Sequence, residues 1–340
     1  MREPISSRDT VSAWSEKGEP VVALESTVIS HGLPQPTNIE TAIECEDAIS
    51  AQGVIPSTIG IVAGVPKIGL SREELRVFAE GRAPDGSPIE KVSLNNLGIV
   101  VARKQWGATT VAGSIWIATL GGQAFDAAGR HASDKLEDAG RKRPLVFSTG
   151  GIGGVHRGAE TTLDISADLA VLASAQIVCC CAGAKAILDI GKTKEELETV
   201  GVPVIGFQTD EFPAFYSRSS GIPVDAAVDS PDQVAEIALA HWRCGDRGSV
   251  LLCVPVPREA EVPANRLEPI INAALQRAEQ QGVRGKAVTP FLLAEVAKAS
   301  GGEALKANRA LLVNNANVAA QVAVSMSRLI EGAEGTARES

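Results

Sequence analysis

Short apolar runs alternate with helical stretches along most of this chain, and this alternation restricts the possible fold more than any other feature. Runs such as Val21–Leu24, Leu145–Ser148 and Ile177–Cys181 are too short to be buried helices. The stretches 38–51 and 71–80 between such runs have the apolar spacing of helices. Short buried strands that alternate with helices are typical of layered α/β folds. The sequence therefore predicts an α/β protein with three layers, α/β/α, around a central, largely parallel or mixed sheet.

The same reading assigns the remaining elements. Further strands or apolar runs are expected at Thr58–Val65, Thr109–Val111, Val202–Gly206 and Val250–Val254. Further helices are expected at Leu97–Gln105, from after Val111 through Leu120, and at Thr161–Ala173, Val234–Trp242, Leu267–Gln281, Pro290–Ser300 and Glu303–Ile330. Another helix is expected to start over Lys185–Ile190. Asn38 is expected to cap the helix that follows it, and the proline-containing segment 31–36 is expected not to be helical.

No internal repeat or clear linker divides the chain, so residues 19–330 are expected to form one domain. The polar segment 1–18 and the tail 331–340 are expected to be loose. The stretch 124–144 is rich in charge and poor in apolar residues. Such a composition favours a solvated surface insertion between a helix and a strand.

Charge and composition exclude several classes of protein. The net charge of −9 argues against non-specific nucleic-acid binding, which requires a basic face. No run is long enough to span a membrane, and the N-terminus lacks the apolar segment of a secretory signal. Cys179, Cys180 and Cys181 are consecutive and form no CxxC pair, which favours small buried side chains in a reducing compartment. We therefore expect a cytoplasmic protein that acts on a small molecule.

Polar residues follow three of the expected strands, at the end of the sheet where ligands bind in open α/β folds. Glu25 follows Val21–Leu24, the glycine-rich segment 149–158 follows Leu145–Ser148, and Lys185 follows Ile177–Cys181 after two small residues and a glycine. These groups converge if the three strands are neighbours in the sheet.

Each of these residues has a chemical interpretation and a structural one. A desolvated lysine such as Lys185 favours the neutral amine that attacks aldehydes, but it could also point outward from a helix start. Glu25 is suited to proton transfer or to capping a neighbouring loop. Asp164 and Asp168 would share one face of an expected helix and could bind Mg²⁺ or Mn²⁺, or could simply complement the helix dipole. The turn Gly150–Gly154 matches no nucleotide-binding motif, and it is equally consistent with an anion site beside His156 and Arg157 or with a plain tight turn.

Several long segments together resemble the pseudouridine-5'-phosphate glycosidase family, which includes the indigoidine-synthesis A proteins. The resemblance covers residues from about 20 to 325 and rests on these motifs: ALESTVISHGLPQP (23–36), GATTV (107–111), FSTGGIGGVHRGAETTLDISADL (147–169), CAGAKAILDIG (181–191), GVPVIGFQTDEFPAFYSRSSG (201–221) and ANRALLVNNA (307–316).

The resemblance implies roles for particular positions. Glu25 would be the proton donor, Lys185 would form a covalent adduct with ring-opened ribose, and Asp164 would hold Mn²⁺ or another divalent cation such as Mg²⁺. The residues that would contact the substrate are Lys91, Val111, His156, Ser166, Ala167, Asp168 and Asn308. The implied reaction is reversible cleavage of pseudouridine 5'-phosphate to uracil and ribose 5-phosphate, and the implied assembly is a homotrimer.

The chain departs from the family pattern at two places. Similar proteins carry KxSRRDL where this chain has Lys91 followed by Val-Ser-Leu-Asn-Asn-Leu, and the stretch 124–144 has no counterpart in them. Two alternatives therefore stay open: another Schiff-base enzyme acting on a sugar phosphate, and a catalytically silent homologue with an interaction role.

Overall fold

The computed structural model describes residues 6–7, 19–121 and 146–338. The strands are β1 (Ser6–Ser7), β2 (Val21–Leu24), β3 (Ile55–Val62), β4 (Val65–Ile68), β5 (Glu90–Val92), β6 (Gly107–Thr109), β7 (Val146–Ser148), β8 (Val178–Cys181), β9 (Val204–Phe207), β10 (Ala226–Val228) and β11 (Val250–Cys253). The predicted insertion 124–144 and most of the predicted N-terminal segment 1–18 lie outside the described residues.

The helices complete the element order. They are a π-helical turn η1 (Val28–Gly32), α2 (Thr37–Ser50), α3 (Arg72–Glu80), α4 (Leu94–Ala102), α5 (Val111–Gly121), α7 (Ala159–Thr162), α8 (Ala167–Leu172), α9 (Ile190–Thr199), α10 (Pro231–Arg243), η2 (Arg258–Ala260), α11 (Ala264–Gln280), η3 (Gly285–Ala287), α12 (Val288–Ala299) and α13 (Glu303–Arg338).

The strands form one mixed sheet with helices on its faces, as the sequence predicted. The order along the sheet is β1-β4-β3-β2-β7-β8-β11-β9-β10, and β6 joins β3 to β5. Only the pairs that β3 makes with β4 and β6 are antiparallel among the described strands. The central strands β2, β7 and β8 are parallel, so their carboxyl ends meet at one edge.

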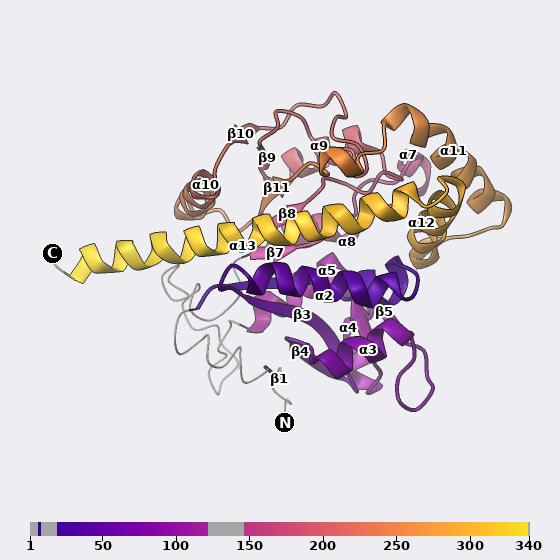
Figure 1. Cartoon of the computed structure of the whole chain (residues 1–340), viewed down its shortest axis with the longest axis horizontal. Coiled ribbons are helices and arrows are strands. Elements are labelled where there is room, and N and C mark those ends of the chain that lie inside the picture. The colour runs from indigo at the N-terminus through magenta and orange to yellow at the C-terminus, as the bar shows by residue number, and fades with distance from the viewer. Residues whose placement is uncertain (1–5, 8–18, 122–145, 339–340) are drawn as a thin grey trace.

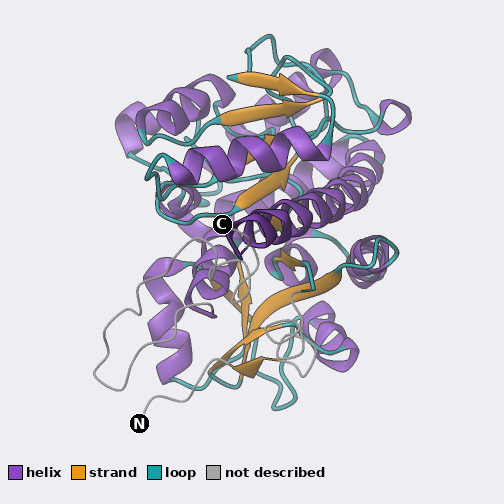
Figure 2. Ribbon diagram, turned by 90° about the vertical axis from the view of Figure 1, so that its left-hand side faces the viewer, coloured by secondary structure: helices purple, strands orange, loops and turns teal. Residues whose placement is uncertain are grey.

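The long helix α13 crosses the middle of the molecule (Figure 1). It packs against α2 and α10 and against the strands β2, β7 and β8. Figure 2 shows it nearly end-on beside the sheet. The helix continues to Arg338, beyond the predicted end at Ile330. Because α13 packs against one face of the three central strands, its side chains reach the loops that leave those strands.

The central strands are buried on both faces, which explains their continuous apolar sequences. Val22, Phe147 and Cys180 are fully buried on the three strands. All six cysteines are unpaired, and only Cys244 among them is exposed. None of the helices in the described ranges is long and apolar enough to cross a bilayer.

Several predicted boundaries were wrong. Helix α4 begins at Leu94 rather than Leu97, because Ser93 and Asn96 form a capping box. The strand predicted at Thr109–Val111 is β6, which ends at Thr109 because α5 starts at Val111.

The segment 28–38 also differs from its prediction. His31 and Gly32 belong to η1, although the segment 31–36 was expected to contain no helix. Asn38 does not cap α2, since its Nδ2 donates to the carbonyls of Ile29 and Ala79 and so ties η1 to α3.

Candidate functional site

The three strands whose ends carry Glu25, the glycine-rich segment and Lys185 are neighbours in the sheet, so the condition that the sequence analysis set for their convergence is met. β2 and β7 pair with Leu24 opposite Ser148, so Glu25 and Thr149 leave the sheet side by side. β8 is the next strand, with Cys180 opposite Ser148. Lys185 follows β8 and reaches back to the loop after β7. Three sequence segments that are far apart in the chain therefore meet at one edge of the sheet.

A pocket of about 330 Å³ opens at this edge. It is lined by every residue to which the family resemblance assigns a role: Glu25, Lys91, Val111, His156, Asp164, Ser166, Ala167, Asp168, Lys185 and Asn308. A volume of this size suits a small molecule such as a sugar phosphate.

Glu25 lines the pocket and is 9% exposed. The hydroxyl of Thr149 donates a hydrogen bond to its Oε1 at 2.5 Å. Burial raises the pKa of the Glu25 carboxyl above its ordinary value, an effect that the positive charge of Lys185 and the bond from Thr149 partly oppose. Glu25 therefore retains its proton at pH values where an exposed glutamate has lost it, which suits a proton donor.

Lys185 does not stand at a helix start, and that part of its prediction was wrong. Helix α9 begins at Ile190, with Asp189 as its N-cap. Gly183 adopts a φ of +80°, and the residues after it bridge to neighbouring loops instead of entering a helix. The half-buried side chain of Lys185 donates from Nζ to the carbonyl of Gly151 at 2.5 Å. The amine is therefore directed into the pocket and not toward bulk solvent.

The two aspartates do not share a helix face, because the predicted helix Thr161–Ala173 is broken. Leu163 has a φ of +54° and ends α7, and Ser166 starts α8 as its N-cap. Asp164 lies in the loop between these helices and Asp168 in the first turn of α8. Both still line the pocket.

The carboxylate of Asp168 connects two backbone segments of the site. Its Oδ1 accepts from the amide of Ala112 at 2.9 Å, and its Oδ2 accepts from the amide of Gly153 at 2.7 Å. It thereby joins the start of α5 to the glycine-rich loop. Space at this loop is tight, since a Cβ on Gly153 would lie 2.3 Å from the Ser166 hydroxyl oxygen.

His156 lies beside Asp164, with 4.0 Å between Nδ1 and Oδ2. Burial lowers the pKa of His156, and the nearby carboxylate of Asp164 opposes this shift while Lys185 and Lys91 reinforce it. The imidazole is therefore neutral near pH 7, so it offers one N–H donor and one acceptor.

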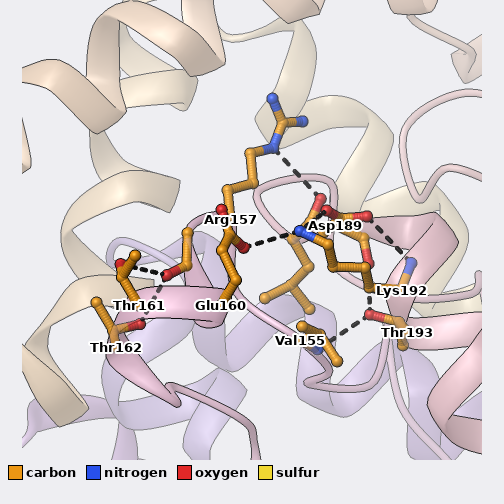
Figure 3. A network of polar contacts seen from close by, with 10 residues as sticks. Val155, Arg157, Glu160, Thr161, Thr162, Asp189, Lys192 and Thr193 are labelled. Atoms are coloured by element: carbon orange, nitrogen blue, oxygen red, sulfur yellow. Dashed lines mark hydrogen bonds and ion pairs between the residues drawn. The ribbon is translucent and has the colours of Figure 1, made fainter.

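A polar network fixes the segment that carries His156 against α9 (Figure 3). The hydroxyl of Thr193 accepts from the amide of Val155 at 3.0 Å, and Lys192 pairs with Glu160 at 2.8 Å. Arg157 does not join His156 as an anion ligand, since its guanidinium pairs with Glu268 of α11 at 2.6 Å.

The remaining predicted residues come from three other elements. Lys91 lies on β5, Val111 is the first residue of α5, and Asn308 is a buried residue of α13. The altered segment after Lys91 is ordered: Asn95 lines the pocket and Asn96 donates from Nδ2 to the Lys91 carbonyl at 3.0 Å.

The donor set for a metal ion is small. No group of three or more His, Cys, Asp or Glu side chains suitable for a metal ion occurs in the described part of the chain. The Asp164 side chain is 43% exposed and lines the pocket. Mg²⁺ and similar ions often keep several water ligands and use one or two carboxylates. Asp164 therefore fits a mostly hydrated ion and not one enclosed by protein ligands.

Sequence reasoning missed several residues of the pocket. Thr149 was treated only as part of a loop, although it follows β7 just as Glu25 follows β2. Phe215, which lies within the motif 201–221, also lines the pocket, as do Thr289 and Leu293, which come from a segment with no recognisable signal. Only the packing of α12 near η1 brings the latter two residues there.

Comparisons with known proteins give consistent matches. The family model described as indigoidine synthase A like protein matches residues 10–130 and 139–325, and the break falls inside the predicted insertion. The chain is 47% identical to a pseudouridine-5'-phosphate glycosidase of Escherichia coli (strain K12), over 92% of each chain. It is 46% identical to the protein of the same name from Geobacillus kaustophilus (strain HTA426), over 95% of this chain and 98% of that one.

Two solved structures have the same fold. The prealnumycin C-glycosynthase AlnA, in complex with ribulose 5-phosphate, matches with a TM-score of 0.81 and 37% identity over 97% of this chain and 99% of that one. An indigoidine synthase A-like protein from Thermotoga maritima matches with a TM-score of 0.81 and 34% identity over 96% of this chain and 97% of that one.

Proposed function

The chain belongs to the indigoidine synthase A-like family, and from that premise we propose that it is a pseudouridine-5'-phosphate glycosidase. It cleaves the C–C glycosidic bond of pseudouridine 5'-phosphate to give uracil and ribose 5-phosphate, in a reversible reaction of pseudouridine catabolism. The observation that carries the proposal is the meeting of a buried carboxyl, Glu25, and an amine, Lys185, in one pocket of a chain so similar to these enzymes.

The reaction requires more than protonation of a leaving oxygen, because the bond to uracil is a carbon–carbon bond. The ribose ring opens when the bond from C1' to the ring oxygen breaks and the oxygen takes a proton. The Lys185 amine then bonds to C1'. When the bond from C1' to C5 of uracil breaks, its electron pair passes to uracil and C5 is protonated. This step leaves an iminium between C1' and Lys185, which water hydrolyses to the free amine and the sugar aldehyde.

Glu25 supplies and recovers the protons in these steps. Burial raises the pKa of the Glu25 carboxyl, so it keeps its proton to higher pH than an exposed glutamate, and the residue lines the pocket directly after β2. The hydroxyl of Thr149 fixes one carboxyl oxygen and leaves the other for the substrate. Lys91 and Lys185 supply positive charge that suits a phosphorylated sugar.

Substrate contacts are assigned to the other lining residues. Ser166, Ala167 and Asp168 present the start of α8 to the pocket, and Val111 presents the start of α5. We assign Asn308 and His156 to hydrogen bonds with the sugar phosphate.

A divalent cation, Mn²⁺ or Mg²⁺, is part of the proposal, with Asp164 as its protein ligand. When bound it would supply positive charge beside anionic groups of the substrate. The exposure of the Asp164 carboxylate and its place in the pocket support this assignment.

A homo-oligomer, a trimer by resemblance, is also part of the proposal. Ile99 on α4 and Trp116 on α5 are 50% and 41% exposed, and these two helices pack together. Exposed large apolar side chains on adjacent helices support a contact between copies of the chain. Sedimentation of the wild type and of Ile99→Asp would test this contact.

The six unpaired cysteines are consistent with a cytoplasmic location.

The decisive experiment is a uracil-release assay with pseudouridine 5'-phosphate, with and without added Mn²⁺. Borohydride reduction in the presence of ribose 5-phosphate should attach the sugar to Lys185. Uracil release together with this adduct is the expected result. An adduct without uracil release would favour another Schiff-base reaction, such as C-glycosylation of a different acceptor, and neither signal would indicate a silent homologue.

A further inference from the structure

The glycine-rich loop that follows β7 is held by side chains from two pocket residues. Lys185 donates to the carbonyl of Gly151, and Asp168 accepts from the amide of Gly153. These two bonds hold the loop at Gly151 and at Gly153. The start of the loop, at 149–150, is held by a residue that does not line the pocket.

That residue is Asn315 of α13. Its Nδ2 donates to the carbonyl of Thr149 at 2.8 Å and to the carbonyl of Gly150 at 3.3 Å. The amide of Thr149 donates to the carbonyl of Cys180 at 3.0 Å. The backbone of Thr149 is therefore fixed on one side by β8 and on the other by α13.

Asn315 lowers the stability of the fold relative to an apolar residue at this position of α13. It is fully buried, and its Oδ1 has no hydrogen-bond partner among the described residues. Buried polar atoms without partners destabilise a fold, and an apolar side chain of similar volume would avoid that cost. Its neighbours Leu311, Leu312 and Ala316 are buried and apolar. The amide group therefore needs an explanation beyond packing, and its two bonds to the loop provide one.

The loop start connects directly to the reaction centre. The Thr149 side chain, whose backbone Asn315 holds, donates to Glu25. A hydroxyl that donates to a carboxylate favours the ionised form, so the position of Thr149 affects how readily Glu25 gives up its proton. The other charged groups that face Glu25 are Lys185, Lys91 and Asp168, and none of them bonds to Asn315.

We propose that Asn315 is a positioning residue for Glu25: it fixes the backbone of Thr149 and Gly150 so that the Thr149 hydroxyl is directed at the Glu25 carboxyl. The proposal rests on the proposed function for its kinetic test. It assigns Asn315 no contact with the substrate.

The test compares the pH dependence of uracil release in wild type, Asn315→Leu and Thr149→Val. Loss of the hydrogen bond from the Thr149 hydroxyl raises the pKa of Glu25 further. The alkaline limb of the pH–rate profile, where Glu25 loses its proton, should therefore move to higher pH. We expect a displacement of about one pH unit in each variant, a tenfold change in the ratio of the protonation states. We also expect kcat to fall about tenfold or more, because misplaced groups react slowly. The double variant should show no further displacement, and Thr149→Ser should restore the wild-type limb.

Asn314→Leu is the matched control. Asn314 is the preceding residue of α13, is half-buried, and donates to the carbonyl of Pro255 at 3.4 Å instead of to the loop. This variant should keep the alkaline limb of the pH–rate profile at the wild-type pH.

A second readout does not depend on turnover. The infrared band of the protonated Glu25 carboxyl, identified by its loss in Glu25→Gln, should titrate at higher pH in Asn315→Leu. If that titration moves but the wild type releases no uracil, the positioning role stands and the proposed function fails.

Three results would overturn the positioning role. One is an unchanged limb and titration in a folded Asn315→Leu. Another is an equal displacement in Asn314→Leu. The third is failure of both Asn315→Leu and Asn315→Ala to fold, which would make the residue a determinant of stability alone.

Discussion

Replacement of Asp168 by asparagine tests the geometry of the site most directly. The carboxylate is 5% exposed, and each of its oxygens accepts one backbone amide, from Ala112 and Gly153. An asparagine has only one acceptor oxygen, so its NH₂ group must face one of these two N–H donors. That donor then loses its partner in a buried position.

The magnitude follows from the bonds involved. Hydrogen bonds to charged groups contribute about 1.5–3 kcal/mol, and an unpaired buried donor costs about 1–3 kcal/mol. Because the two effects overlap, we expect Asp168→Asn to destabilise the fold by about 2–4 kcal/mol. For a chain of 340 residues that corresponds to a fall in Tm of roughly 3–6 °C. Activity should also fall, since the loop that Asp168 holds carries the Gly151 carbonyl bonded to Lys185.

Thermal unfolding and uracil release measure the two effects separately. Asp164→Asn is the control, because the same chemical change occurs four positions away in a side chain that is 43% exposed. That variant should change stability by less than about 0.5 kcal/mol. If Asp168→Asn and Asp164→Asn unfold at the same temperature as the wild type, the two amide bonds do not hold the loop.

Three further predictions concern the chemistry. Lys185→Ala should lose uracil release by several orders of magnitude, because the substitution removes the amine that forms the imine; a variant that keeps more than a tenth of wild-type activity rules out the covalent mechanism. Asp164→Asn should keep the fold but lose most of the activation by Mn²⁺, whereas wild-type activity that survives a chelator unchanged would remove the metal from the reaction. Glu25→Gln should abolish turnover yet raise the unfolding midpoint relative to wild type at pH 9 and not at pH 4. The reason is that burial raises the pKa of the Glu25 carboxyl, so the wild-type fold loses stability as the pH rises and this buried group must ionise. The neutral glutamine has no such loss. Equal differences at both pH values in denaturant titrations would contradict the buried acid.

The sequence by itself determined the fold class and most of the site. The runs that became β2, β7 and β8 are apolar throughout because both faces of these strands are buried, so their composition reveals them without any partner. Parallel strands present their carboxyl ends to one edge, so the sequence indicated that Glu25 and Lys185 would meet if their strands were neighbours, and the strand order of the sheet met that condition. The motif resemblance added residues such as Lys91 and Asn308, whose positions follow from no local pattern.

Only the tertiary structure decided how the site residues are oriented. The helix predicted across Asp164 and Asp168 is interrupted because Leu163 takes a left-handed conformation, and the Asp168 carboxylate bonds to amides from two other segments. The role of Asn315 depends on a partner 166 positions away in the chain. Local sequence patterns record which face of an element is buried, but hydrogen bonds between distant segments form only when packing brings those segments together.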